Sequence, residues 1–211
     1  MIKLTPKSHS TDGGSASSPP LVNRLLAPLN MTGPASSEVE ARLRRMVTSH
    51  IDSLWRFVRR LGVFETDIDD VMQEVILIAS RRLDEIPTDS EKSFLFGTAF
   101  RVASEERRKR ARRHEVGEES LVDRMDPSPG PEQVLDRAAA RKMLDRMLSD
   151  MPLDLRAVFV LYEIEEHTMS EIASLLDLAP GTVASRLRRA REQFEARVAR
   201  ETSKLRRGGE S

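Results

Sequence analysis

Apolar side chains recur at the three- and four-residue spacing of an α-helix along most of this chain, and no strand-like alternation exceeds a few residues. This pattern covers three segments before residue 114 and four after residue 131. The segment between them, 114–131, is rich in Glu, Asp, Pro and Gly and lacks helical periodicity. The sequence therefore predicts an all-α protein with two small helical domains joined by a flexible acidic linker.

The first domain is predicted at 36–113 and contains three helices. The first helix is expected to begin at the capping-box pattern Ser37-x-x-Glu40 and to end at Gly62. The second covers about 66–83, and the third starts near residue 93 and becomes almost wholly basic. Short connections between three such helices predict one compact unit.

The second domain is predicted at 132–206. Its four helices are expected at 132–148, 152–163, 170–176 and 180–206, with Pro152 and Pro180 suited to a first helical turn. Residues 1–35 are predicted to form a disordered tail, because their Ser, Gly and Pro residues bury too little surface to offset the entropy of ordering. Residues 207–211 are predicted to form a second tail.

Composition excludes several classes of protein. The absence of Cys excludes disulfides, thiolate zinc sites, iron–sulfur clusters and a cysteine nucleophile. The four His residues have no metal-ligand spacing, and the Asp69/Asp70 pair lacks both a His partner and a phosphate-binding Gly loop. We therefore expect no metal, no cofactor and no enzyme activity. No apolar run matches a membrane span or a signal peptide, so a cytoplasmic protein without membrane insertion is expected.

Residues 169–187 have the spacing of a helix-turn-helix. Ser170 is expected to cap the first helix, Leu178 to fill the turn, and Val183 and Leu187 to anchor the second helix. The exposed face of that helix is expected to carry five DNA-binding side chains: Thr182, Ser185, Arg186, Arg188 and Arg189. Such hydroxyls and guanidiniums suit base edges and phosphates in a major groove. An ordinary helical hairpin with a solvated basic face is the alternative.

The segment 153–191 resembles region 4 of sigma-70 family RNA polymerase sigma factors, specifically the extracytoplasmic-function group. The family pattern there joins an R-x-V helix to S/T-x-x-E-I-A and G-T-V-K-S-R-L-x-R-A-R. Here Ala184 stands in place of the Lys, and Met151-Pro152 replaces Leu-Pro. Loss of that Lys is expected to weaken promoter binding slightly and in a salt-dependent way. The resemblance implies that the second helix reads the −35 promoter element.

A second motif is similar to region 2 of the same family. The family's D-x-x-Q-E pattern is matched by Asp70, Gln73 and Glu74, which lie three and four residues apart and so share a helix face. The resemblance implies that this face binds the clamp helices of the largest subunit of core RNA polymerase. A solvated helix face is the alternative. The next segment, from Ser93, resembles the family's S/T-F-x-x-W-L pattern but lacks its Trp.

The resemblance also implies contacts with the −10 element in the first domain. The loop 87–93 matches in position the family loop that captures a flipped −10 base. The run 107–113 has six cations in seven positions, which suits phosphate neutralisation. The expected −10 contacts are Asp89, Ser90, Lys92, Arg101, Arg107, Arg108, Lys109 and Arg110. The linker is implied to thread the polymerase channel that later carries RNA.

Together these motifs predict a transcription initiation factor that binds core RNA polymerase and directs it to promoters through the −10 and −35 elements. Its expected partners are core polymerase, promoter DNA and an anti-sigma factor. An autonomous helix-turn-helix regulator acting as a dimer is the main alternative, and a scaffold without DNA binding is a third. The Asp70-x-x-Gln73-Glu74 helix and the basic third helix favour the sigma factor, because a dimeric regulator needs neither.

Overall fold

The computed structural model describes residues 23–26, 34–115 and 143–208, and all regular structure in these ranges is helical, as expected. The first group of helices, called the N-terminal unit below, comprises α2 (Pro34–Arg60), α3 (Glu65–Arg81), two 3-10 turns (Leu83–Glu85 and Thr88–Ser90) and α4 (Glu91–Glu115). The second group, the C-terminal unit, comprises helical residues 143–149, α6 (Leu153–Glu163), α7 (Met169–Leu176) and α8 (Pro180–Gly208).

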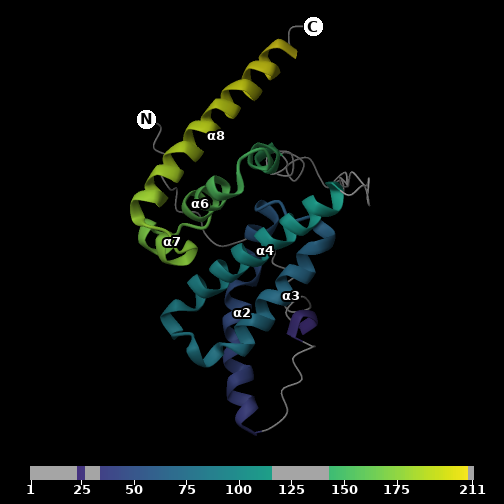
Figure 1. Ribbon diagram of the computed structural model, residues 1–211, viewed down its shortest axis with the longest axis vertical. Helices are drawn as coiled ribbons and strands as arrows, with labels where there is room; N and C mark the ends of the chain where they lie inside the picture. The colour runs from purple at the N-terminus through teal and green to yellow at the C-terminus, as the bar shows by residue number, and fades with distance from the viewer. Residues whose placement is uncertain (1–22, 27–33, 116–142, 209–211) are drawn as a thin grey trace, which may run out of the picture.

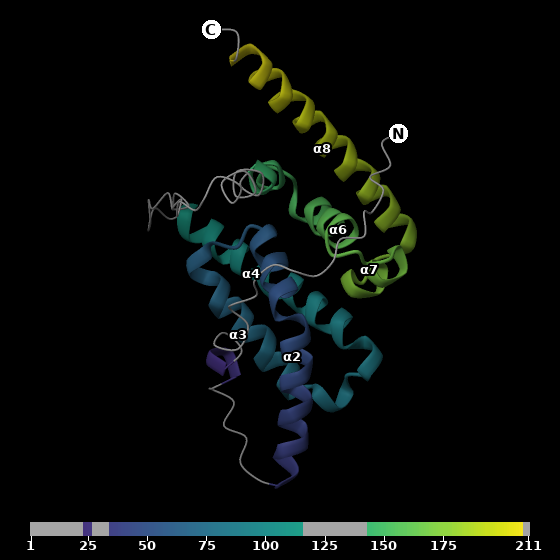
Figure 2. The ribbon, with the colours of Figure 1, turned by 180° about the vertical axis from the view of Figure 1, so that it is seen from behind.

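The N-terminal unit is a bundle in which α2, α3 and α4 all pack on one another. Figures 1 and 2 show these helices in one half of the molecule and α6 and α7 in the other, with the C-terminal part of α8 projecting away from both. The unit's core is apolar because each helix turns one hydrophobic stripe inward. Fully buried examples are Phe57 of α2, Met72 of α3 and Phe96 of α4.

Helix boundaries follow the predicted signals with small differences. Gly62 ends the α2 region with a φ of 84°, and its N–H donates to the carbonyl oxygen of Arg59 at 2.9 Å. This left-handed conformation is one that glycine adopts without strain. At the other end, α2 begins at Pro34 and not at the predicted box around Ser37. Proline is well suited to a first helical turn, where its missing N–H has no intrahelical partner anyway.

Part of the predicted N-terminal tail is ordered. Residues 23–26 form a helical turn in which Leu25 and Leu26 are 4% and 9% exposed. Arg24 forms an ion pair with Asp69, and Arg44 donates to the side chain of Asn23 at 2.8 Å. Disorder was therefore the wrong prediction for these four residues, because two adjacent leucines find an apolar surface to cover. Of the predicted linker, residues 116–131 lie outside the described ranges, and α4 continues to residue 115.

No helix in the described ranges is long and apolar enough to cross a membrane. The same ranges contain no group of three or more His, Asp or Glu side chains that could hold a metal ion.

Candidate nucleic-acid and polymerase interface

The helix-turn-helix begins with a capping box at the start of α7. The Thr168 hydroxyl accepts a hydrogen bond from the Glu171 N–H at 3.2 Å, and the Glu171 carboxylate accepts one from the Thr168 N–H at 2.7 Å. The hydrogen bonds that the Glu171 carboxylate accepts from the Thr168 N–H and, at 2.8 Å, from the Thr168 hydroxyl lower the pKa of Glu171. The prediction that Ser170 caps this helix was wrong, because Thr168 occupies the N-cap. A carboxylate three residues after the cap completes the box for Thr168 and not for Ser170.

The turn that follows α7 orients α8. Asp177 adopts a left-handed conformation with a φ of 53°, and the Leu178 N–H donates to the Ala173 carbonyl oxygen at 2.9 Å. Val183 and Leu187 of α8 are 0% and 1% exposed, as their predicted anchoring role requires. One stripe of α8 is thereby fixed against α6 and α7, and its opposite face is turned to solvent.

That opposite face carries the five residues predicted to bind −35 DNA. Ser185, Arg188 and Arg189 are exposed, whereas Thr182 and Arg186 are half-buried. Arg186 lies 3.4 Å from a carboxylate oxygen of Asp154, and Arg188 pairs with Glu192 one turn later at 2.8 Å. Arg189 makes no ion pair within the described part of the chain, so its guanidinium is the most available to a phosphate.

The three residues predicted to bind polymerase do share a face of α3. Asp70, Gln73 and Glu74 are all exposed, while Val71 and Val75 on the other side of the helix are 2% and 0% exposed. The exposed face therefore presents two carboxylates and one amide, which suits a partner surface rich in basic groups.

The loop before α4 is held by a residue that sequence reasoning missed. Arg42 of α2 donates to the carbonyl oxygens of Leu83, at 3.1 Å, and Ile86, and it pairs with Glu91 at 3.0 Å. The predicted −10 residues of this loop surround that anchor. Asp89 is exposed, the Ser90 hydroxyl donates to the Asp89 carboxylate at 3.1 Å, and the Lys92 ammonium lies 5.9 Å from the centre of the Phe96 ring.

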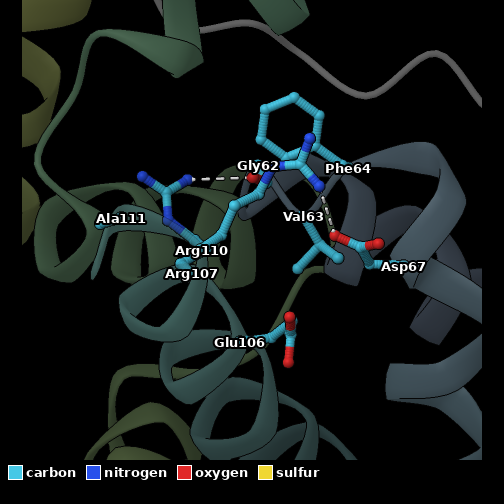
Figure 3. Close-up of a pocket in the computed structure, with 8 residues that line it drawn as sticks. All are labelled: Gly62, Val63, Phe64, Asp67, Glu106, Arg107, Arg110 and Ala111. Atoms are coloured by element: carbon cyan, nitrogen blue, oxygen red, sulfur yellow. Dashed lines mark hydrogen bonds and ion pairs between the residues drawn. The ribbon is translucent and has the colours of Figure 1, made fainter. Parts of the chain in front are cut away.

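The basic end of α4 contains cations that hold the helix against the rest of the unit and cations that are exposed. Arg107 donates to the carbonyl oxygens of Leu61 and of Gly62, the latter at 3.3 Å, and burial lowers its pKa. Arg110 pairs with Asp67 at 3.0 Å and lies 3.5 Å above the centre of the Phe64 ring. Figure 3 shows both arginines among the residues that line a pocket at the α2–α3 connection, with Arg107 directed to Gly62 and Arg110 to Asp67. These two side chains therefore fasten α4 to the rest of the unit.

The remaining predicted −10 residues of α4 are more accessible. Arg101 and Arg108 are exposed, and Lys109 lies 3.5 Å from the carboxylate of Glu105 on its own helix. From Lys92 to Arg108 the helix rises about 24 Å, which is the length of about seven base pairs. The structure thus places the exposed cations along one helix, with Arg108 and Lys109 more than about 20 Å from the loop before it.

Known proteins resemble this chain in sequence and in fold. Residues 141–194 match the family described as Sigma-70, region 4. The RNA polymerase sigma factor CnrH of Cupriavidus metallidurans is 32% identical over 173 residues, which cover 77% of this chain and 89% of CnrH. The ECF RNA polymerase sigma factor SigE of Mycolicibacterium smegmatis is 27% identical over 162 residues. That match covers 75% of this chain and 62% of SigE, so the chain spans less than two thirds of that relative.

Two solved structures share the fold. The sigma factor RpoE from Bartonella quintana, in complex with the anti-sigma factor NepR, superposes with a TM-score of 0.61 at 20% identity, over 72% of this chain and 94% of RpoE. The structure of CnrH in complex with the cytosolic domain of CnrY superposes with a TM-score of 0.55 at 24% identity. That match covers 85% of this chain and 97% of the CnrH chain. The 32% identity to CnrH over most of both sequences decides the family. The chain belongs to the sigma-70 family of RNA polymerase sigma factors, in its extracytoplasmic-function group.

Proposed function

We propose that this chain is a dissociable initiation subunit that binds core RNA polymerase and recognises promoters through −10 and −35 elements. The proposal rests on the presence of two separate exposed faces in one chain of this family. One face is the Asp70/Gln73/Glu74 surface of α3, and the other is the solvent side of α8. A regulator that binds DNA on its own has no use for the first face.

The proposed −35 contacts lie in the first turns of α8, where the N-terminal residues of a recognition helix reach base edges. Arg186 is the proposed base-reading residue, since a guanidinium can bind guanine in a bidentate way. Its pairing with Asp154 fixes the side chain near the helix start and must give way when DNA binds. Arg188 and Arg189 are the proposed phosphate contacts.

The proposed −10 contacts divide by their accessibility. Asp89, Ser90 and Lys92 offer polar groups to an unstacked base at the loop before α4. Arg101, Arg108 and Lys109 are available to phosphates. Arg107 and Arg110 are proposed to act indirectly, because they hold α4 in place through Leu61, Gly62 and Asp67.

Polymerase docking is tested with a Gln73→Ala/Glu74→Lys double variant. We expect its affinity for core polymerase to fall at least about tenfold, equivalent to about 1.4 kcal/mol, with helicity unchanged. Asp84→Lys is the matched control, because it makes the same charge reversal at an exposed site outside the α3 helix. Equal affinities for the two variants and the wild type, measured by titration of labelled chain with core polymerase, would exclude this face.

Promoter recognition is tested by run-off transcription with purified core polymerase on cognate and −35-scrambled templates. Arg186→Ala is expected to reduce transcription from cognate promoters at least about tenfold, since a bidentate base contact contributes about 1–3 kcal/mol of discrimination. Arg189→Ala should weaken all templates alike. If Arg186→Ala reduced transcription equally on cognate and −35-scrambled templates, Arg186 would contribute only general electrostatic attraction to DNA. Absence of any specific transcript from a genomic promoter pool would refute the proposed function.

We also propose that an anti-sigma factor restrains this chain, as the structures of RpoE with NepR and of CnrH with the cytosolic domain of CnrY suggest. Co-purification of a tagged chain from its own host, followed by addition of the captured protein to the transcription reaction, tests this. The captured inhibitor should abolish run-off product. Activation of an inactive purified chain by a small ligand alone would contradict it.

A further inference from the structure

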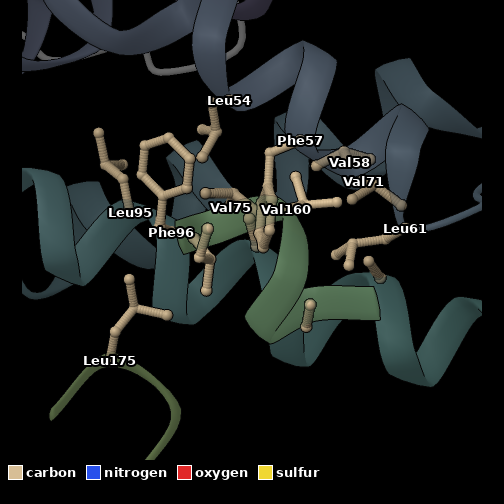
Figure 4. Packing of buried hydrophobic residues seen from close by; sticks show 14 of the residues in the cluster. Leu54, Phe57, Val58, Leu61, Val71, Val75, Leu95, Phe96, Val160 and Leu175 are labelled. Atoms are coloured by element: carbon tan, nitrogen blue, oxygen red, sulfur yellow. The ribbon is translucent and has the colours of Figure 1, made fainter. Parts of the chain in front are cut away.

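The N-terminal and C-terminal units are packed against each other. Helix α4 contacts α7, and α2 contacts α6. Val160 of α6 and Leu175 of α7 are 0% and 5% exposed, and both belong to the apolar cluster that includes Phe57 and Phe96. Figure 4 shows these side chains converging from the helices of both units. The interface between the units therefore has an apolar centre.

Polar contacts surround that centre. The guanidinium of Arg156 in α6 is 1% exposed and donates across the interface to the carbonyl oxygen of Leu61 at 2.9 Å. It also donates within its own unit to the carbonyl oxygens of Ser149 and Met151, at 2.5 and 2.9 Å. A buried charge of this kind is tolerated only while its partners are in place.

Two ion pairs also join the units. Arg60 of α2 pairs with Glu165, which follows α6, at 3.1 Å, and their side chains are only 16% and 6% exposed. Arg59 pairs with Asp145 of the helical residues 143–149. Since both arginines come from the last turn of α2, this end of the helix is bound to the C-terminal unit at two points.

Helices α4 and α7 approach each other closely at Gly97. A Cβ atom at this position would lie 2.8 Å from the carbonyl oxygen of Leu175, nearer than Cβ atoms come to other groups. In the S/T-F-x-x-W pattern of the family, Trp lies three residues after Phe. In this chain the residue three positions after Phe94 is Gly97. A Trp side chain there would occupy the space that α7 fills. This chain can bring α7 onto α4 because it has no side chain at that point.

We propose that this packing is a closed, autoinhibited state of the chain and that Gly97 makes it possible. The closed state must open before both units can contact one promoter. The proposal rests on the proposed function. Along α4, Arg113 lies at most about 24 Å from Gly97, at 1.5 Å per residue. Pro180, which begins α8, lies at most about 18 Å from Leu175.

Arg189, the last proposed −35 contact, lies at most about 14 Å beyond Pro180 along α8, and packed helices such as α4 and α7 lie about 10 Å apart. Added together, these limits keep the two DNA-binding faces of the closed state within about 65 Å of each other. The −10 and −35 elements are centred about 25 base pairs apart, which is about 85 Å of B-form DNA. The closed chain therefore cannot occupy both elements together. Opening separates α7 from α4 and releases the contact of Arg156 with Leu61.

The state of the chain is measured as a distance between two spin labels. The sequence contains no Cys, so Ser49→Cys in α2 and Ser174→Cys in α7, both at exposed positions, give one labelled pair. The parent chain should give one narrow distance distribution. Gly97→Ala and Gly97→Trp should shift it to longer and broader distances, with α4 intact because both residues favour a helix more than glycine does.

Two controls separate opening from damage. Gly181→Ala makes the same chemical change in α8 where no atom lies within 4 Å of the new Cβ, and the distribution should not move. Arg60→Glu should open the chain, and the double variant Arg60→Glu/Glu165→Arg should restore the short distance by reversing the pair. Unchanged distances in the Gly97 and Arg60→Glu variants, or a broad distribution in the parent chain, would overturn the closed state.

Transcription provides the second measurement. At subsaturating chain, Gly97→Ala should increase run-off product from a cognate promoter severalfold, since opening is no longer opposed. Longer spin-label distances without such an increase in run-off product would show that the closed state does not inhibit transcription. Absence of transcripts from every form of the chain would instead refute the proposed function, and the spin-label distances would still report on the packing of the two units.

Discussion

Arg156 shows how much a single side chain stabilises this fold. Burial lowers the pKa of its guanidinium to about 10, so the group remains charged at neutral pH and needs all three of its carbonyl partners. Arg156→Met, which keeps the length of the side chain, should lower the free energy of unfolding by about 3 kcal/mol. Urea denaturation followed by circular dichroism measures this.

The control for that prediction is Arg45→Met on the exposed side of α2, which should change stability by no more than about 0.5 kcal/mol. An Arg156→Met chain as stable as the wild type would mean that an apolar side chain serves equally well between the units.

Among the elements, α7 has only eight residues and begins with a capping box. Thr168→Ala removes the hydroxyl that accepts from the Glu171 N–H and should cost about 1 kcal/mol of stability. Ser170→Ala, two residues later inside the helix, should cost much less. Thermal unfolding of the two variants compares them directly. Equal losses of stability in the two variants would contradict the assignment of Thr168 as the N-cap and favour the predicted cap, Ser170.

Helix positions were predictable from the sequence because apolar periodicity records which stripe of each helix is buried. Val183 and Leu187 in α8 and the Asp70 face of α3 were placed correctly for this reason. Caps were less predictable, since Thr168 and Ser170 are both good capping residues and only Glu171 distinguishes them. The engagement of Arg107 and Arg110 with the α2–α3 connection was hidden, because a basic run has the same sequence whether its members are free or paired.

At the scale of the whole molecule, the sequence predicted two units but not their contact. Helical periodicity shows that Val160 and Leu175 are buried without showing which helix buries them. The one local signal was Gly97, a residue without a side chain in the apolar first part of α4. Such a glycine often marks a close approach of another backbone, and here that backbone is α7.

His167 should make the packing of the two units dependent on pH. Its imidazole is 2% exposed and meets the Phe96 ring edge-on, with 5.0 Å between ring centres. Burial, aided by Lys92 and His50 and opposed by Glu171, lowers the pKa of His167 to about 4. In the open chain the imidazole is hydrated and regains a pKa of about 6.5. The proton is therefore bound more tightly by the open state than by the closed one.

The closed state should thus be fully favoured above about pH 6.5 and lose up to about 3 kcal/mol as the pH falls toward 4. The spin-label distance from residue 49 to residue 174, recorded between pH 7.5 and 4.5, measures the loss. Burial also raises the pKa of Glu165, which lies between the units, so the wild type is compared with His167→Phe, which retains that carboxylate. The His167→Phe chain should stay closed to a lower pH. If both chains opened over the same range, His167 would have no part in the transition.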